Sequence, residues 1–240
     1  NFENHINNIQ KKIREKKELS FLHSGHAGDI VNILPVIKEL SKKQKCNFYI
    51  GIDKPLKTYY PKHPAGDVFI NNKIYNMLEP LLKKQSYINN VKKFNDEKID
   101  INFDIIREIP INLLFDNTKY SFVVTGIQPN LTLPYIESDN HDKLIKKVVI
   151  QRTFRYRNPF INYKFLNEYE NLLFVGTKEE FDDMKLDVKK LEFYDCKDFL
   201  EMSSIIKSSK FVIANSSIAF PIAEGLKVPR LLEACPHFPA

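Results

Sequence analysis

Five residues with the chemistry of an active site lie in one short turn near the start of the chain. They follow an apolar run at 19–22 and precede a segment at 30–40 whose apolar spacing predicts a helix. The two glycines permit tight turning and close approach of the backbone to a ligand. The acid could cap the helix or, in a partly dry cleft, act as a general base with a raised pKa, and the histidines could touch a substrate. The residues concerned are Asp29 as the catalytic candidate and His23, Gly25, His26 and Gly28 as turn or acceptor-side candidates.

Three arginines follow the first strand that is predicted in the second half of the chain. Arg152, Arg155 and Arg157 come after the apolar run 147–151, and the carboxyl end of a parallel strand is where ligands bind. Guanidinium groups at this spacing could clamp a diphosphate through paired hydrogen bonds. The alternative is a basic loop on the surface. The position at a strand end favours the clamp.

A third candidate segment, 175–181, is a strand-to-helix turn with two acids. The strand ends at Gly176, and the helix opens with Thr177 and Glu180 at the spacing of a capping box, which by itself explains much of the pattern. A carboxylate here, Glu179 or Glu180, could also accept hydrogen bonds from ribose hydroxyls.

A fourth segment, 212–229, runs from a buried strand through a small polar turn into a helix. Asn215, Ser216 and Ser217 are good N-cap residues, and the N–H groups beyond them would form an anion site. Small side chains at this turn would let a phosphate come close. Glu224, near the end of the helix, completes the set of binding candidates. The alternative is an ordinary crossover between two parallel strands.

Strand and helix patterns alternate along the chain with short links, as in βα units on a parallel sheet. In the first half the sequence predicts a leading helix within 1–17, strands at 19–23, 47–52, 67–70 and 99–105, and helices at 30–43, 72–94 (divided by Pro80) and from 110. In the second half it predicts strands at 147–151, 172–176, 191–194, 211–214 and 228–232, and helices at 160–170, 178–184, 198–207 and 219–226.

These elements predict an α/β protein of two Rossmann-like domains, whose parallel sheets face each other across a cleft. The boundary is expected in the polar, turn-rich stretch 134–146. It divides the chain into an N-terminal, acceptor-side domain, 1–137, and a C-terminal, nucleotide-binding domain, 138–240.

The composition restricts the remaining classes of function. The 240 residues are 43% hydrophobic, enough for packed cores, and carry a net charge of +6. This charge suits binding to an anionic small molecule, a membrane surface or nucleic acid. The alternative is that it reflects solvated helix faces. Nucleic acid is not expected, because no basic motif with interleaved aromatic residues is present. The three cysteines lack disulfide or metal-ligand spacing, so we expect no metal site and a cytoplasmic protein. No apolar run approaches the about 20 residues that span a bilayer, and no signal peptide is visible.

In three segments the sequence resembles the heptosyltransferase-like glycosyltransferases of family 9, which have the glycosyltransferase-B (GT-B) fold. Segment 25–35 is similar to the glycine and Gly-Asp turn that precedes an apolar helix with proline in that family. Segment 171–180 is similar to its strand-glycine-acid segment, and 211–229 to its late polar turn, helix and following strand. The order and spacing of the three segments are more specific than any one of them.

The resemblance implies a metal-independent, inverting glycosyltransferase with a nucleotide sugar as donor and no cofactor. It assigns the catalytic base to Asp29 and the diphosphate to Arg152 and Arg155. It implies a glycan or lipid-linked acceptor, as in lipopolysaccharide synthesis, and leaves room for peripheral contact with the inner face of a membrane. The other donor-binding residues that it implies are Gly176, Glu179, Glu180, Asn215, Ser216, Ser217 and Glu224.

The late turn departs from the family pattern. Asn215 and Ser217 stand where the family has an acid and a glycine, Phe220 stands where it has a histidine, and its closing helix is not recognisable. These departures keep open a second hypothesis, a non-catalytic module that binds a nucleotide or nucleotide sugar. An epimerase with the same two-domain architecture is a further alternative.

Overall fold

The first half of the chain forms a four-stranded sheet. The computed structural model describes residues 2–57, 60, 62–108 and 117–236. The strand order is β3-β2-β1-β4, and all pairs are parallel. The elements of this half are α1 (Phe2–Glu15), β1 (Glu18–His23), α2 (Ala27–Asn32), α3 (Leu34–Leu40), β2 (Lys45–Ile50), α4 (Asn72–Lys84), β3 (Asn90–Lys93), β4 (Ile101–Asn102), the 3-10 helix η1 (Phe103–Glu108) and α5 (Asn117–Thr125).

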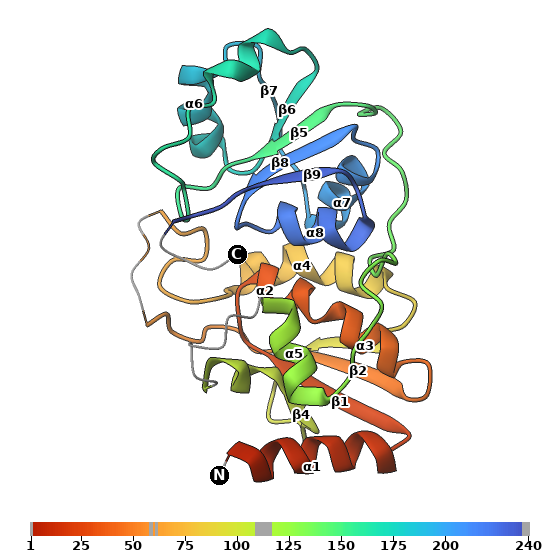
Figure 1. The fold of residues 1–240 in the computed structure, drawn as a ribbon. Coiled ribbons are helices and arrows are strands. Elements are labelled where there is room, and N and C mark those ends of the chain that lie inside the picture. Colours follow the sequence, from red (N-terminus) through yellow and green to blue (C-terminus); the bar gives the residue numbers. More distant parts are fainter. Residues whose placement is uncertain (1, 58–59, 61, 109–116, 237–240) are drawn as a thin grey trace.

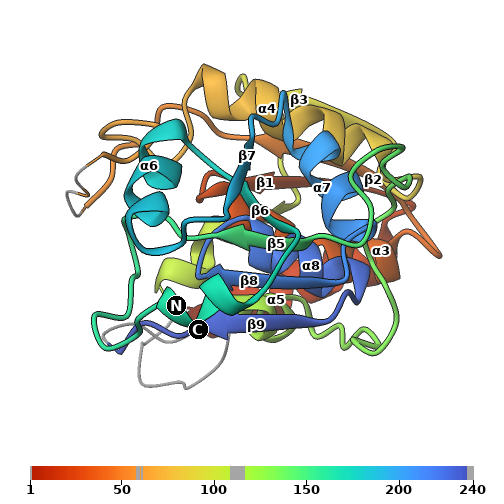
Figure 2. The ribbon, with the colours of Figure 1, turned by 90° about the horizontal axis from the view of Figure 1, so that it is seen from above.

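The second half forms a five-stranded sheet with the order β7-β6-β5-β8-β9, again with all pairs parallel. Figure 2 shows these strands side by side, as seen from above. The elements are β5 (Val148–Gln151), the 3-10 helix η2 (Lys164–Glu168), β6 (Leu172–Val175), α6 (Lys178–Asp187), β7 (Glu192–Tyr194), α7 (Phe199–Lys207), β8 (Phe211–Asn215), α8 (Ala219–Leu226) and β9 (Arg230–Glu233).

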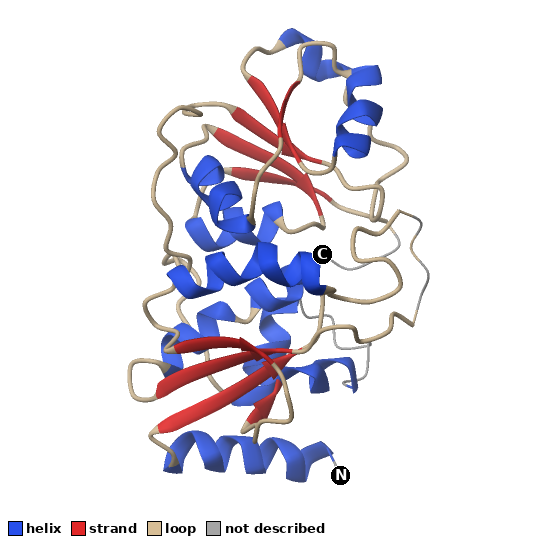
Figure 3. Ribbon diagram, turned by 180° about the vertical axis from the view of Figure 1, so that it is seen from behind, coloured by secondary structure: helices blue, strands red, loops and turns tan. Residues whose placement is uncertain are grey.

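Helices of both halves fill the space between the two sheets. Figure 1 shows α2, α4, α7 and α8 between the upper and the lower sheet, with α1 below the lower one, and Figure 3 shows the same layers from behind. Helix α4 packs against α7, and α2 packs against α8. Buried side chains from both halves form one continuous hydrophobic cluster. The sheets are therefore held together by a shared core.

Strand β6 shows why the second sheet has continuous apolar runs. Its side chains alternate, so that Leu173 and Val175 belong to the shared core while Leu172 and Phe174 pack in an outer cluster with residues of α6. A parallel sheet that is covered on both faces needs apolar side chains at successive positions. The five strands predicted in this half are confirmed to within two residues at each end.

The predicted helix at 72–94 is correct only as far as Lys84. Residues 90–93 form strand β3, and Pro80 lies inside α4 without dividing it. Val91 is buried in the core and pairs with Phe48 of β2. This pairing partner is distant in sequence, so local periodicity does not reveal it.

Other predicted elements are shorter than expected. The helix expected at 30–43 is two helices that meet at Ile33, with Pro35 in the first turn of α3. The strands expected at 99–105 and 67–70 are reduced to β4 and to one isolated bridge between Pro55 and Val68, and the helix expected at 160–170 is reduced to η2. The helix expected from 110 begins outside the described residues.

Residues 126–147 connect the two halves and contain no helix or strand. The predicted boundary between 137 and 138 lies in this segment, and the division into two domains stays a prediction. The segment is packed against both halves: the backbone N–H groups of Tyr135 and Ile136 donate to Gly225 O at 2.8 and 3.1 Å, and the Tyr87 hydroxyl donates to Tyr135 O at 2.6 Å.

Candidate active site between the two sheets

The loops at the carboxyl ends of four strands line one cavity. The strand order reverses between β1 and β4 in the first sheet and between β5 and β8 in the second, and ligands bind at such switch points in open α/β sheets. The cavity has a volume of about 1410 Å³. Because single-ligand pockets measure about 300–1,000 Å³, it has room for more than one small ligand. The candidates that line it are Asp29, His26, Gly28, Arg155, Ser216, Ser217 and Glu224.

Asp29 lies in the first turn of α2, directly after β1. Its Oδ2 accepts the backbone N–H of His26 at 3.0 Å, and also a hydrogen bond of 3.0 Å from Nη2 of Arg107. Among the described residues both of its polar contacts go to Oδ2, and the side chain is 21% exposed. The cap predicted as an alternative is therefore present, and Oδ1 remains for a ligand.

Gly25 makes this arrangement sterically feasible. A Cβ at this position would lie 2.5 Å from Nη2 of Arg107 and 2.8 Å from Oδ2 of Asp29. Only a glycine lets the turn pass this close to the ion pair.

A second acid, Asp104, lies in the same part of the cavity, and both of its carboxylate oxygens have polar partners. Its Oδ1 accepts the backbone N–H of Ser24 at 2.8 Å and lies 3.1 Å from Nδ1 of His23, and its Oδ2 accepts from Nζ of Lys54 at 2.8 Å. Burial alone would raise the pKa of Asp104, but the hydrogen bonds from His23, Lys54 and Ser24 outweigh it and lower the pKa well below the usual range. Asp104 is therefore a fixed anion and not a proton acceptor. His23 itself is fully buried and does not line the cavity.

Arg107 links the two acids and was missed by the sequence analysis. Its guanidinium donates to Asp29 and, at 3.3 Å, to Oδ1 of Asp104, and it lies 4.5 Å from the centre of the Phe69 ring. A signal was present in the sequence, because Asp104 and Arg107 follow strand β4 at the edge next to β1. The longer strand expected at 99–105 obscured it.

Arg155 crosses from the second half to the first. Its Nη1 donates to Nε2 of His26 at 2.9 Å, and its guanidinium lies over the rings of Tyr60 and Tyr156 at 5.0 and 4.6 Å. Burial, and then the positive charge of Arg155, lower the pKa of His26 to about 3. The imidazole is thus neutral at ordinary pH and can accept the hydrogen bond from the arginine.

Arg152 does not line the cavity, and the structure gives no support to its predicted contact with a diphosphate. Its Nε and Nη2 donate to the two carboxylate oxygens of Glu233 at 2.8 and 3.0 Å, with the Glu233 side chain only 1% exposed. A carboxylate this deeply buried needs a counter-charge, and Arg152 supplies it. Arg157 likewise turns away, toward Asp183 at 2.5 Å.

The turn after β8 supplies fewer free groups than expected. Gln151 Oε1 accepts both the Ser217 hydroxyl at 2.7 Å and the Ala219 N–H at 2.9 Å, and Pro221 has no N–H. The N-terminus of α8 is thus largely satisfied within the protein. The hydroxyl of Ser216 is the side-chain group of this turn that the structure leaves for a ligand.

The acids of the third segment lie outside the main cavity. Glu180 is buried and accepts the Thr177 N–H at 3.1 Å as a capping box requires; burial raises its pKa. It lines a smaller cavity of about 110 Å³ next to Arg155. The Glu179 side chain is 70% exposed and lies 3.7 Å from Lys62, and Gly176 lines neither cavity.

Glu224 lines the main cavity but is engaged by two cations. Its carboxylate forms ion pairs with Arg230 and Lys227. Of the cavity-lining acids that were predicted or are described above, Asp29 therefore has the least engaged carboxylate.

Two absences concern the described part of the chain. Within it, no three histidine, cysteine, aspartate or glutamate side chains are grouped so as to hold a metal ion. Nor does any helix within those ranges combine the length and apolar character needed to cross a membrane.

Comparison with known proteins identifies the fold. No family model and no curated protein sequence matches the chain. The structure of the Escherichia coli heptosyltransferase WaaC with ADP matches it with a TM-score of 0.54 and 8% identity, over 90% of this chain and 86% of that chain. The dodecameric, iron-containing heptosyltransferase TibC in complex with ADP-D-β-D-heptose matches with a TM-score of 0.52 and 9% identity; the match covers 91% of this chain but 59% of TibC.

The chain thus has the GT-B-like fold of heptosyltransferases, with two all-parallel sheets. The predicted fold class and the resemblance in fold are confirmed. At this level of identity the similarity concerns the fold alone.

Proposed function

We propose that this protein is a glycosyltransferase that moves a sugar from a nucleotide-sugar donor to a hydroxyl group of a glycan or lipid-linked acceptor. One observation carries the proposal: Asp29, at the switch point of the first sheet, and Arg155, at that of the second, line one cavity. Displacement at an anomeric carbon requires a base on one side and a cation beside the leaving diphosphate on the other. WaaC and TibC were solved with ADP and ADP-D-β-D-heptose, which supports a nucleotide sugar as the donor class.

In the proposed reaction Asp29 acts as the general base. Its Oδ1 accepts the proton of the acceptor hydroxyl, whose oxygen forms a bond to the anomeric carbon. The bond between that carbon and the diphosphate oxygen breaks at the same time, so the configuration inverts. The hydrogen bonds from His26 and Arg107 to Oδ2 orient the carboxylate for this step.

Arg155 and Ser216 are proposed to receive the leaving group. The guanidinium would neutralise charge that develops on the diphosphate, and the hydroxyl would donate to a phosphate oxygen. The proposal assigns charge neutralisation to side chains and requires no metal or cofactor. The cytoplasmic location and the peripheral contact with a membrane stay predictions.

A second candidate function is a binding module that holds a nucleotide sugar without reacting. Phe220 favours it, because this apolar side chain lines the cavity where the similar family has a histidine. A cavity that lost one polar group in this way could retain binding and lose turnover.

The test is a titration of the purified protein with ADP, GDP, UDP, CDP and the corresponding nucleotide sugars, with the unfolding temperature as readout. A ligand at about 100 times its Kd stabilises the folded state by about 2.7 kcal/mol. We expect at least one nucleotide to stabilise the wild type, and Arg155→Ala to reduce that stabilisation by weakening the binding of the nucleotide. Arg14→Ala, an exposed arginine on α1 that does not line the cavity, is the matched control.

Transfer to a panel of hydroxyl acceptors is then measured with the donor that binds. Sugar transfer supports the enzyme. Binding without transfer or donor hydrolysis favours the binding module, and the absence of any nucleotide-dependent stabilisation would overturn both.

A further inference from the structure

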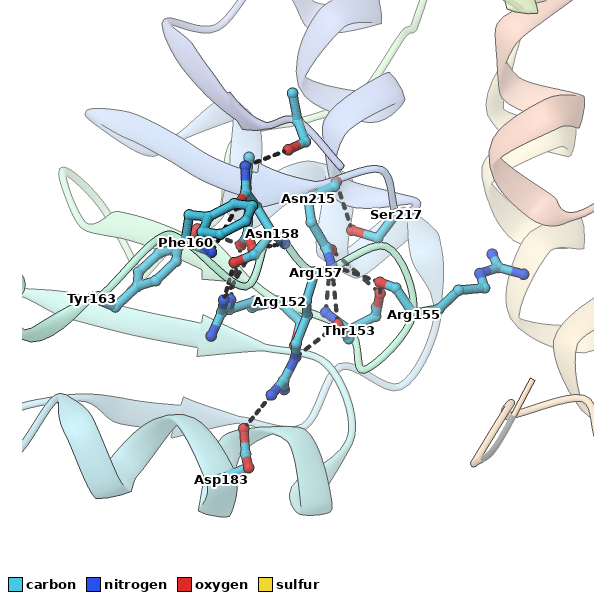
Figure 4. A network of polar contacts seen from close by, with 12 residues as sticks. Arg152, Thr153, Arg155, Arg157, Asn158, Phe160, Tyr163, Asp183, Asn215 and Ser217 are labelled. Atoms are coloured by element: carbon cyan, nitrogen blue, oxygen red, sulfur yellow. Dashed lines mark hydrogen bonds and ion pairs between the residues drawn. The ribbon is translucent and has the colours of Figure 1, made fainter. Parts of the chain in front are cut away.

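Asn215, the last residue of β8, is fully buried. Both the oxygen and the nitrogen of its side-chain amide form hydrogen bonds with the loop that carries Arg155. Oδ1 accepts the backbone N–H of Thr153 at 3.2 Å and lies 3.3 Å from the Thr153 hydroxyl, whose shorter contact, of 2.9 Å, is to Arg155 O. Nδ2 donates to Thr153 O at 3.0 Å and to Arg155 O at 2.8 Å. Figure 4 shows these contacts converging on the one side chain.

The four groups around the side chain of residue 215 favour an amide over a carboxylate at this position. Two of the partners are carbonyl oxygens, which need a donor, and an ionised carboxylate has none to offer. An aspartate at 215 would place an anionic oxygen about 3 Å from two carbonyl oxygens. The departure from the acid of the similar family therefore matches the backbone that surrounds it.

Other polar contacts also fix the loop from Arg152 to Asn158. Arg152 pairs with Glu233, which also accepts the Asn158 N–H at 2.6 Å, and Arg157 pairs with Asp183. Arg155 is the arginine of this loop that has no acidic partner among the residues described. Figure 4 shows its side chain leaving the network toward the helices of the first half.

The residue after Arg155 is a second indication that the backbone of this loop is constrained. Tyr156 has φ of 61°, a left-handed conformation that is unfavourable for a residue with a side chain. Such a conformation persists where the surroundings fix the chain on both sides. The Nδ2 group of Asn215 holds the carbonyl of Arg155 immediately before this residue.

We propose that Asn215 is a positioning residue, which sets the backbone at Arg155 so that its guanidinium faces the donor diphosphate. It binds no ligand itself, and its effect on affinity passes through Arg155. This inference rests on the proposed function, because it assumes that Arg155 contacts a nucleoside diphosphate.

The experiment is a double-mutant cycle on the Kd for ADP, GDP, UDP and CDP, each titrated separately by calorimetry. Asn215→Asp is expected to raise the Kd of the bound nucleotide about tenfold or more, and to add less than about twofold when Arg155 is already alanine. Coupling of this kind is not expected of a residue that only supports the fold.

Asn167→Asp is the matched control. Its Nδ2 also donates to two carbonyl oxygens, of Lys164 and Asp187, and its Oδ1 accepts the Lys189 N–H. Asn167 lies in η2, next to the end of α6, and lines neither cavity. We expect the Kd of Asn167→Asp for the bound nucleotide to stay within about twofold of the wild-type value.

The outcomes separate the two proposals. If the wild type binds none of the four nucleotides, both the proposed function and this inference are overturned. If the wild type binds but Asn215→Asp binds equally well, or weakens binding as much without Arg155 as with it, only the positioning role is overturned. Should Asn215→Asp not fold, as judged by circular dichroism, Asn215→Ser replaces it, since a hydroxyl cannot donate to both carbonyls.

Discussion

At the scale of the residue, the proposed reaction uses one oxygen of the Asp29 carboxylate, and the helix cap uses the other. Sequence spacing left a helix cap and a general base as alternatives. The structure shows the cap on Oδ2, together with the pair to Arg107, and leaves Oδ1 to the cavity. The two roles are therefore compatible, and a substitution must separate them.

Asp29→Asn makes that separation. It keeps an oxygen for the His26 N–H but removes the proton acceptor, so we expect transfer to fall by about 10²–10⁴-fold. Nucleotide affinity should change by less than about threefold, because the proposed donor site lies at the other sheet. Steady-state rates and calorimetry on the same protein measure the two quantities.

Asp182→Asn serves as the control, since Asp182 is an exposed acid of α6. It should leave both quantities unchanged. Full turnover in Asp29→Asn would remove the proposed base.

At the scale of the element, the loop after β5 depends on acids from strands and helices far along the chain. Glu233 of β9 lies beside β8 and reaches Arg152, Asn158 and the hydroxyl of Tyr163. The arginine pattern alone indicated a clamp made of several guanidinium groups. The structure assigns Arg152 to a buried pair, because β9 brings a carboxylate to the same sheet edge.

Glu233→Gln tests the contribution of that pair to stability. It leaves the Arg152 guanidinium, only 11% exposed, without its counter-charge. Breaking a buried pair in this way should lower the free energy of unfolding by about 3–5 kcal/mol, as measured by urea denaturation. Glu170→Gln, which breaks an exposed pair with Lys190, should cost less than about 1 kcal/mol. Equal costs for the two variants would contradict the assignment.

The element scale also shows where prediction succeeded. Strands β5, β6 and β8 are apolar at successive positions and were predicted to within a residue, since a strand covered on both faces has a local signature. Strand β3 has one buried residue, Val91, between polar neighbours, so only its pairing with β2 defines it.

At the scale of the whole molecule, the contact between Arg155 and His26 joins the two switch points. A neutral imidazole is needed there, because a second positive charge would face the guanidinium at 2.9 Å. The same contact makes the stability of the molecule sensitive to acid.

The sign of this dependence follows from the pKa of His26, about 3 in the folded protein and about 6.5 in an unfolded chain. The unfolded chain binds the proton first, so the contribution is complete above pH 6.5 and is lost as the pH falls toward 3. Between about pH 6.5 and 4.5, the wild type should lose about 2 kcal/mol more than His26→Asn.

Urea denaturation at several pH values measures this difference. The lowered pKa of His63 also makes the folded state less stable as the pH falls, and the raised pKa of Glu180 makes it more stable. Both residues are present in the wild type and in His26→Asn, so their effects are common to the two proteins. Asp104, with its lowered pKa, contributes mainly below about pH 4. Parallel curves for the two proteins would show that His26 does not titrate as described.

The sequence by itself determined the alternation of strands and helices, the two parallel sheets, and the turn that carries Asp29. These features have local causes: apolar runs, glycines at a tight turn and capping residues at helix starts. Only the tertiary structure decided which cations face the cavity. It neutralised Arg152 with Glu233, left Arg155 without an acid within the described chain, and placed Arg107 between two carboxylates. The physical reason is that a charged side chain is directed by the partner it meets in space, and these partners lie on strands and helices that only folding brings together.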